Sequence, residues 1–166
     1  MTNLAAKQVK DVLEGMLGRD VLVHDGVPLP IDSAPRPTIA TYVDDTHSLA
    51  TVAVMDFALT AYAGAALGLV PRGGAEAAIE DRELPASLLE NAAEVLNVLA
   101  APLTEAGGAH QRLLEAYGPD RLPPAQVSAW CATLGSRLDL DVEVSGYGHG
   151  RLSFVATHGC GCRTVA

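Results

Sequence analysis

Two short segments near the C-terminus constrain the fold more than any other feature of the sequence. Residues 138–144 alternate strictly between apolar and acidic side chains, and residues 151–156 alternate in return after the glycine-rich segment 146–150. A period of two is typical of a strand with one buried face. The two segments therefore predict an antiparallel hairpin, and a hairpin needs further strands or helices to be stable.

A second hairpin is predicted in the first half of the chain. Residues 38–43 and 48–55 are apolar and β-branched, and the Asp-Asp-Thr-His segment 44–47 between them is rich in turn-forming residues. The preceding segment, residues 21–36, contains several prolines and cannot be a central strand. We expect it to form an edge strand or an extended crossing.

The other apolar segments have helical spacing or helical composition. Gly18 stands where the first of these helices would end, and Asp56 can cap the start of the second. We expect helices over residues 4–17, 57–67, 76–81, 85–102, 111–117 and 125–134.

Composition narrows the fold class. The chain has 166 residues, of which 49% are hydrophobic but only 4% aromatic, so the core must consist mainly of Ala, Leu and Val. Its length suits one domain. We expect a single α/β domain over residues 1–157, with long helices packed on an antiparallel or mixed β-sheet, and a mobile tail over residues 158–166.

Charge and hydropathy exclude several partners. The net charge of −9 argues against nucleic acid, which attracts clustered Lys and Arg. No apolar segment reaches the ~18–20 residues needed to cross a bilayer, and the N-terminus lacks the apolar core of a signal peptide. The odd number of cysteines, with Cys160 and Cys162 one residue apart, fits a reducing compartment. The sequence thus predicts a cytoplasmic protein that binds neither nucleic acid nor membrane.

No motif of the usual catalytic kinds is complete. His158, Cys160 and Cys162 could supply metal ligands, but a closed zinc site needs four, so a mobile tail without a catalytic part is the preferred interpretation. The remaining histidines have no neighbouring nucleophile in sequence, although a triad assembled in space stays possible. The Pro-Arg-Gly-Gly segment 71–74 lacks the Lys and Ser/Thr of a phosphate loop.

The segment 85–102 carries the candidate site. At about 100° per residue, Leu89, Ala92, Leu96 and Leu99 gather on one side of a helix, and Glu90, Glu94, Asn97 and Ala101 gather on the other. Residues three apart on a helix are neighbours, so Glu94 and Asn97 can contact one partner group together.

Two simpler interpretations of these residues stay open. Glu94 and Asn97 could belong to an ordinary solvated helix face. Glu90 could close a capping box with Ser87 at the start of the helix. Against the first, Asn is a weak helix former, costing up to roughly 0.7 kcal/mol relative to Ala.

The order of elements and the Glu94-x-x-Asn97 motif resemble the CheC/CheX/FliY family of chemotaxis phosphatases, most closely the single-site CheX type. The likeness spans residues 4–155. The family pattern is Asp/Ser-x-x-x-Glu-x-x-Asn with a proline downstream, for which Pro119 or Pro123-Pro124 are candidates. Glu90 stands where Asp or Ser is usual. Leu96 replaces a glycine that often precedes the Asn, and its bulk could alter how closely a partner approaches.

The resemblance implies a function and a site. It implies hydrolysis of the aspartyl-phosphate of a CheY-like response-regulator receiver domain, with the helix inserted into the receiver's active site. Asn97 would orient the attacking water and Glu94 would meet a receiver lysine. The chain would need no metal or cofactor of its own, because Mg²⁺ is expected in the receiver.

Two alternatives accompany this hypothesis. The same architecture could be a non-catalytic module that binds a receiver or a flagellar-switch partner. A third reading is a small-molecule-binding α/β domain that uses a cleft beside the Ala-rich helix 57–67. The high apolar fraction and the strand edges also predict self-association, with a homodimer as the expected form.

Overall fold

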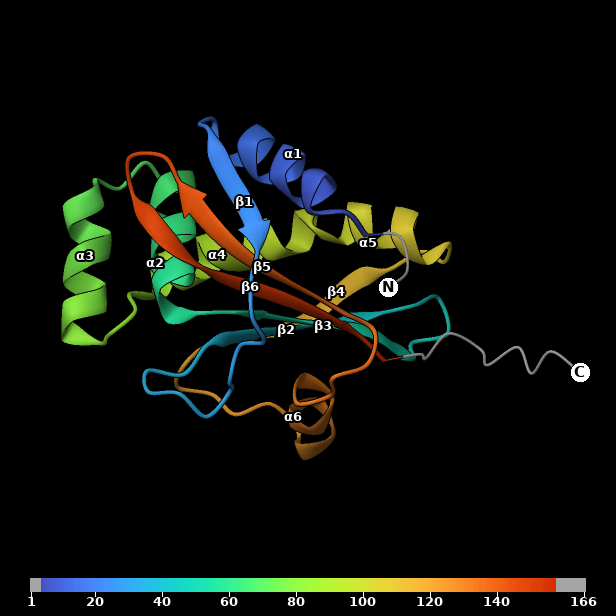
Figure 1. Ribbon diagram of the computed structural model, residues 1–166. Helices are drawn as coiled ribbons and strands as arrows, with labels where there is room; N and C mark the ends of the chain where they lie inside the picture. The colour runs from blue at the N-terminus through green and yellow to red at the C-terminus, as the bar shows by residue number, and fades with distance from the viewer. Residues whose placement is uncertain (1–3, 158–166) are drawn as a thin grey trace, which may run out of the picture.

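A computed structural model describes residues 4–157, which form helices on a six-stranded antiparallel sheet with the strand order β1-β5-β6-β3-β2-β4 (Figure 1). The predicted α/β class and the antiparallel alternative are confirmed. The strands are β1 (Val21–Asp25), β2 (Thr38–Val43), β3 (Leu49–Met55), β4 (Arg112–Tyr117), β5 (Arg137–Val144) and β6 (Gly148–Ala156). The helices are α1 (Ala6–Leu17), α2 (Phe57–Leu67), α3 (Arg72–Asp81), α4 (Ala86–Val98), α5 (Ala100–Gly107) and α6 (Ala125–Cys131).

Both predicted hairpins are present, and in the second the alternating residues of β5 divide between the two faces of the sheet. On β5, Leu140, Val142 and Val144 face the main core, while the acidic residues between them are partly or fully exposed. The main core also takes residues from α1, α2, α4 and α5. A smaller core on the other face lies beneath α6 and includes Leu29, Ile39 and Val127. The sheet is therefore covered on both faces, more heavily on one (Figure 1).

The proline-bearing segment 21–36 is expected to form an edge strand or an extended crossing, and its first residues form the edge strand β1. β1 occupies its first residues and pairs with β5, and the prolines follow after the strand has ended. Gly26 continues the pairing with an N–H bond of 2.9 Å to the Asp139 carbonyl. A side chain at Gly26 would lie 2.8 Å from the Leu140 backbone carbon, so the close approach requires glycine there.

The helix predicted over residues 111–117 is wrong, since this segment is strand β4. β4 pairs antiparallel with β2, with a register irregularity between Thr41 and Tyr42. The sequence Arg-Leu-Leu-Glu-Ala-Tyr has helix-forming residues, and edge pairing in the sheet overrides that local preference. The predictions for residues 158–166, including those for His158, Cys160 and Cys162, concern positions outside the described residues.

The helix predicted over residues 85–102 is interrupted, and Pro102 explains the interruption. In a continuous helix the residue-102 N–H would donate to the Val98 carbonyl, but proline has no N–H and its ring crowds that carbonyl. α4 ends at Val98 and α5 begins at Ala100. Pro102 itself is buried within the first turn of α5, where a missing N–H is tolerated.

The α2 and α4 helices touch backbone to backbone. A Cβ added at Gly64 of α2 would lie 2.2 Å from the Leu88 carbonyl oxygen of α4, closer than any real contact. The Asn91 side chain of α4 donates a hydrogen bond of 3.1 Å to the Gly64 carbonyl. As the sequence predicted, small residues on α2 permit this close packing. Asp56 caps α2 as expected, since its carboxylate accepts from the Leu59 N–H at 2.7 Å.

A largely buried ion pair fixes the end of α6 to the sheet. Arg137 binds both carboxylate oxygens of Asp139, at 2.7 and 2.8 Å, and donates to the Thr133 carbonyl just after α6 at 2.8 Å. Ser153 on β6 donates to the same carboxylate at 2.6 Å. Residues two apart on a strand share a face, which places Arg137 and Asp139 together. No helix within residues 4–157 is long and apolar enough to cross a membrane.

The α2–α4 contact gives a stability prediction with an internal control. Gly64→Ala should lower the free energy of unfolding by about 3 kcal/mol, because the new methyl group meets a backbone carbonyl that cannot move without separating the helices. Gly15→Ala in α1 should raise it by about 0.5–1 kcal/mol, because nothing lies within 4 Å of the added Cβ. Urea unfolding of both variants measures the difference, and equal effects would contradict the close contact.

Candidate functional site

The predicted polar face of α4 is exposed over its whole length. Glu90, Glu94, Asn97 and Ala101 all face solvent, and we call these residues the α4 stripe. Ala101 continues the stripe past the interruption onto α5. The face predicted to be polar is therefore also the face that a partner can reach.

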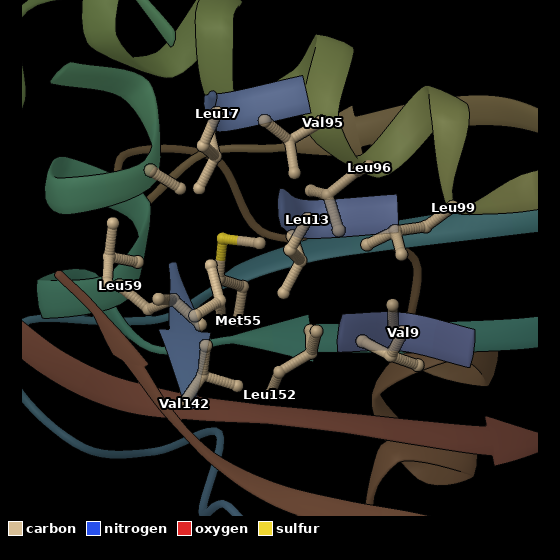
Figure 2. Packing of buried hydrophobic residues seen from close by; sticks show 14 of the residues in the cluster. Val9, Leu13, Leu17, Met55, Leu59, Val95, Leu96, Leu99, Val142 and Leu152 are labelled. Carbon is tan, nitrogen blue, oxygen red and sulfur yellow. The ribbon is translucent and has the colours of Figure 1, made fainter. Parts of the chain in front are cut away.

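The opposite side of α4 is anchored in the core. Val95, Leu96 and Leu99 are fully buried, and Figure 2 shows them pointing toward α1 residues such as Leu13 and toward Met55 of β3. Leu89, predicted to be on this side, is only half-buried, and a Cβ at Gly118 would lie 2.6 Å from its side chain. Leu89 thus flanks the core and packs against the segment that follows β4.

Tyr42 fixes the end of α4 at the level of the stripe. The Tyr42 hydroxyl, fully buried on β2, donates a hydrogen bond of 2.6 Å to the Leu96 carbonyl. That carbonyl lies where α4 gives way to α5 and needs a donor from outside the helix. Burial raises the pKa of the Tyr42 hydroxyl, so it stays protonated and keeps donating. Asn97 follows directly and is therefore held on a rigid part of the chain.

The side chains of Glu94 and Asn97 make no hydrogen bond or ion pair within residues 4–157. The structure thus uses neither polar group to hold the fold together. They sit on adjacent turns of one helix face, so their polar ends can meet a single partner group. What the structure provides is an accessible carboxylate and carboxamide on a rigid support.

The capping-box interpretation of Glu90 is wrong. The N-cap of α4 is Pro85, two residues before Ser87, and no side chain of the described residues 4–157 makes a capping hydrogen bond there. Ser87 is therefore already inside the first turn. Glu90 is exposed and, one turn before Glu94, adds a second carboxylate to the stripe.

Leu96 does not crowd the stripe. The sequence suggested that a leucine just before Asn97 could alter a partner's approach, but its side chain is fully buried in the main core (Figure 2). It points away from the face that carries Glu94 and Asn97. The departure from the family pattern at this position consequently leaves the exposed surface open.

Neither a reactive cysteine nor a metal-binding cluster is found within residues 4–157. Burial raises the pKa of the Cys131 thiol to about 11, so it is un-ionised at neutral pH and a poor nucleophile. Within residues 4–157, no group of three or more His, Cys, Asp or Glu side chains is placed to hold a metal ion.

A cleft of about 530 Å³ lies at the start of α2, near the place of the predicted small-molecule cleft. His24, Asp141 and Arg151 line it from three neighbouring strands, together with Asp56. Burial raises the pKa of Asp56, and its carboxylate accepts backbone N–H groups of Leu59 and Arg151. No residue of α4 lines this cleft, so it is separate from the stripe.

Comparison with solved structures identifies the fold. The middle domain of FliM from H. pylori aligns over 91% of this chain and 84% of its own, with a TM-score of 0.61 and 9% identity. FliY from Thermotoga maritima aligns over 93% of this chain and 85% of its own, with a TM-score of 0.54 and 18% identity. FliM in the FliG–FliM complex from H. pylori aligns over 93% and 87%, with a TM-score of 0.55 and 12% identity.

The chain has the CheC/CheX/FliY fold. Identities this low establish the fold alone. No protein-family model matches the sequence, and no curated protein is significantly similar to it.

Sequence reasoning found the stripe but missed what positions it. The sequence predicts only a strand at Tyr42, because no local pattern signals a hydroxyl that reaches a helix residue 54 positions later. Pro102 was seen as the end of a helix, whereas it divides α4 from α5. That signal was available, since a proline inside a helical pattern breaks the bond to the fourth residue before it.

The stripe predicts a sharp contrast between neighbouring residues. Glu94→Ala and Asn97→Ala should change the free energy of unfolding by less than about 0.5 kcal/mol, because both side chains are exposed and unpaired. Leu96→Ala should lower it by about 2–5 kcal/mol, because it opens a cavity in the core. Thermal and urea unfolding test this, and a large loss for Asn97→Ala would mean that the stripe is structural.

Proposed function

We propose that this chain hydrolyses the aspartyl-phosphate of a CheY-like response-regulator receiver domain, with the α4 stripe inserted into the receiver's active site. The single observation that carries the proposal is the state of Glu94 and Asn97, which are exposed, adjacent and unused by the fold. Their spacing is that of the phosphatase motif to which the sequence is similar. The CheC/CheX/FliY fold is consistent with it.

The chemistry needs little more than this pair. An aspartyl-phosphate is a reactive acyl phosphate, and its receiver supplies the Mg²⁺ that neutralises the phosphoryl oxygens. Water attacks phosphorus, the P–O bond to the aspartate breaks, and inorganic phosphate and a free carboxylate result. Acceleration then depends on positioning the water and on electrostatics. No metal or cofactor bound by the phosphatase itself is needed.

Each residue has a distinct role in this reaction. The Asn97 carboxamide oxygen accepts a hydrogen bond from the attacking water and turns a water lone pair toward phosphorus. The Glu94 carboxylate binds a lysine of the receiver, so it contributes mainly to docking. The hydrogen bond from Tyr42 to the Leu96 carbonyl holds the end of α4, and with it the Asn97 backbone, in one place, so that only the side-chain rotamer has to be set when the receiver binds. Positional precision of this kind is what water-orienting groups require.

The two roles separate in steady-state kinetics. Asn97→Ala should lower kcat by on the order of 10²-fold, as for loss of one polar group that acts in a transition state. Glu94→Ala should mainly raise KM for the phosphorylated receiver. The measurement is loss of the phosphoryl group from a panel of phosphorylated receivers from the same source, with the protein at catalytic concentration.

A matched control comes from α3. Glu80 is also an exposed helical glutamate, and it lies outside the stripe, so Glu80→Ala should keep wild-type kcat and KM. Equal rates for wild type, Asn97→Ala and Glu94→Ala would refute the phosphatase mechanism.

One observation favours a second candidate, a non-catalytic module that binds a receiver or a flagellar-switch protein. The FliM domains share this fold, and one of them is seen in complex with FliG. Under this alternative the stripe is a docking surface only. Saturable binding of a phosphorylated receiver, with no acceleration of its dephosphorylation, would select it over the phosphatase.

A further inference from the structure

Leu69, in the turn between α2 and α3, is an unfavourable residue for folding on two counts. Its φ of +55° lies in the left-handed region, which side chains such as leucine rarely adopt. Its side chain is also 80% exposed, so the chain gains almost no burial from it. A residue that is both strained and solvent-exposed is more readily explained by binding than by stability.

The hydrogen bonds of the turn show that Leu69 stands at a position where glycine is usual. The Val70 N–H bonds the Ala65 carbonyl at 2.9 Å, and the Leu69 N–H bonds the Ala66 carbonyl at 3.4 Å. This is a Schellman motif, in which the left-handed position is usually glycine. Arg82 occupies the corresponding left-handed position at the end of α3, but its charged side chain is well solvated when exposed. Among residues 4–157, Leu69 is the one non-glycine residue with a left-handed backbone that also has an apolar side chain.

The turn is hydrogen-bonded on one side and contacts α4 at Asn91 on the other. The Tyr147 hydroxyl donates to the Val70 carbonyl at 2.6 Å, which fixes the backbone beside Leu69. On the other side, a Cβ at Gly68 would lie only 2.3 Å from the Asn91 carboxamide nitrogen. Asn91 directly follows Glu90 and precedes Glu94 by three residues. Leu69 is exposed and directly follows the glycine that contacts Asn91, so the turn meets α4 between Glu90 and Glu94 in the sequence.

We propose that Leu69 is an apolar docking residue for the receiver domain that the α4 stripe engages. This inference rests on the proposed function and assigns part of its specificity. An acidic and amide stripe beside one rigid leucine fits a partner surface that pairs a lysine with a small apolar depression. Presenting leucine on a fixed backbone limits the entropy lost on binding, and burial of one such side chain can dominate a small interface.

The test uses Leu69→Gly, Leu69→Ala and the matched control Leu134→Ala. Leu134 is 78% exposed and follows α6, and α6 lies on the opposite face of the sheet from α2 and α4 (Figure 1). Kinetics with a phosphorylated receiver should show KM raised on the order of 10-fold for both Leu69 variants, with kcat unchanged, because one buried leucine contributes about that factor. Leu134→Ala should retain the wild-type KM.

The Tm of Leu69→Gly distinguishes a docking role from a structural one, because loss of a structural residue would lower the Tm. Leu69→Gly relieves the left-handed strain, so its Tm should rise by about 2 °C while its KM worsens. Wild-type KM in both Leu69 variants, with normal wild-type turnover, would overturn this inference and leave the phosphatase proposal intact. A wild-type protein that neither binds nor dephosphorylates any receiver in the panel would overturn both.

Discussion

The backbone contact between α2 and α4 at Gly64 is the constraint on which the arrangement of the molecule depends. With no Cβ at Gly64, the Leu88 carbonyl comes close enough for the two helices to share one layer over the sheet. Asn91 then bonds the Gly64 carbonyl and fixes the rotation of α4 about its own axis. Once that rotation is fixed, Leu96 must point into the core, and Glu94 and Asn97 must point out. The exposed stripe is a consequence of how tightly the two helices pack.

Much of this could be predicted from the sequence, because the periodicity of its elements is strong. The alternation in residues 138–144 predicted β5, and the 3.6-residue period of α4 predicted which of its residues are exposed. The failures arose where tertiary contacts decide. β4 contains good helix formers and becomes a strand because β2 offers an edge. Ser87 and Glu90 match a capping box in sequence, but the N-cap is Pro85 and the helix begins at Ala86, earlier than that motif assumes.

Part of the candidate site could be predicted from the sequence and part could not. Glu94 and Asn97 could be found from spacing alone, since a helix brings residues three apart together. The left-handed backbone of Leu69 could not be predicted, because no feature of the neighbouring sequence indicates that a leucine takes this position at the end of α2. With Gly68 directly before it, the local sequence points to the wrong residue for that conformation. Tyr42 could not be found either, since its partner is the Leu96 carbonyl, and backbone atoms leave no signature in a sequence.

Under the proposed function, the α4 stripe acts in the active site of another protein, and such an arrangement raises the question of how the right partner is selected. One carboxylate and one carboxamide on a helix face are common, so they cannot distinguish one partner from another. Selectivity must come from contacts around the pair, and those contacts must be exposed and rigid before the partner arrives. Exposure of an apolar group and rigidity in a strained conformation both cost stability. The close packing of α2 on α4 and the buried core beneath them supply the stability that lets the chain keep a residue such as Leu69. The same packing brings the turn that carries Leu69 against α4 at Asn91, three residues before Glu94.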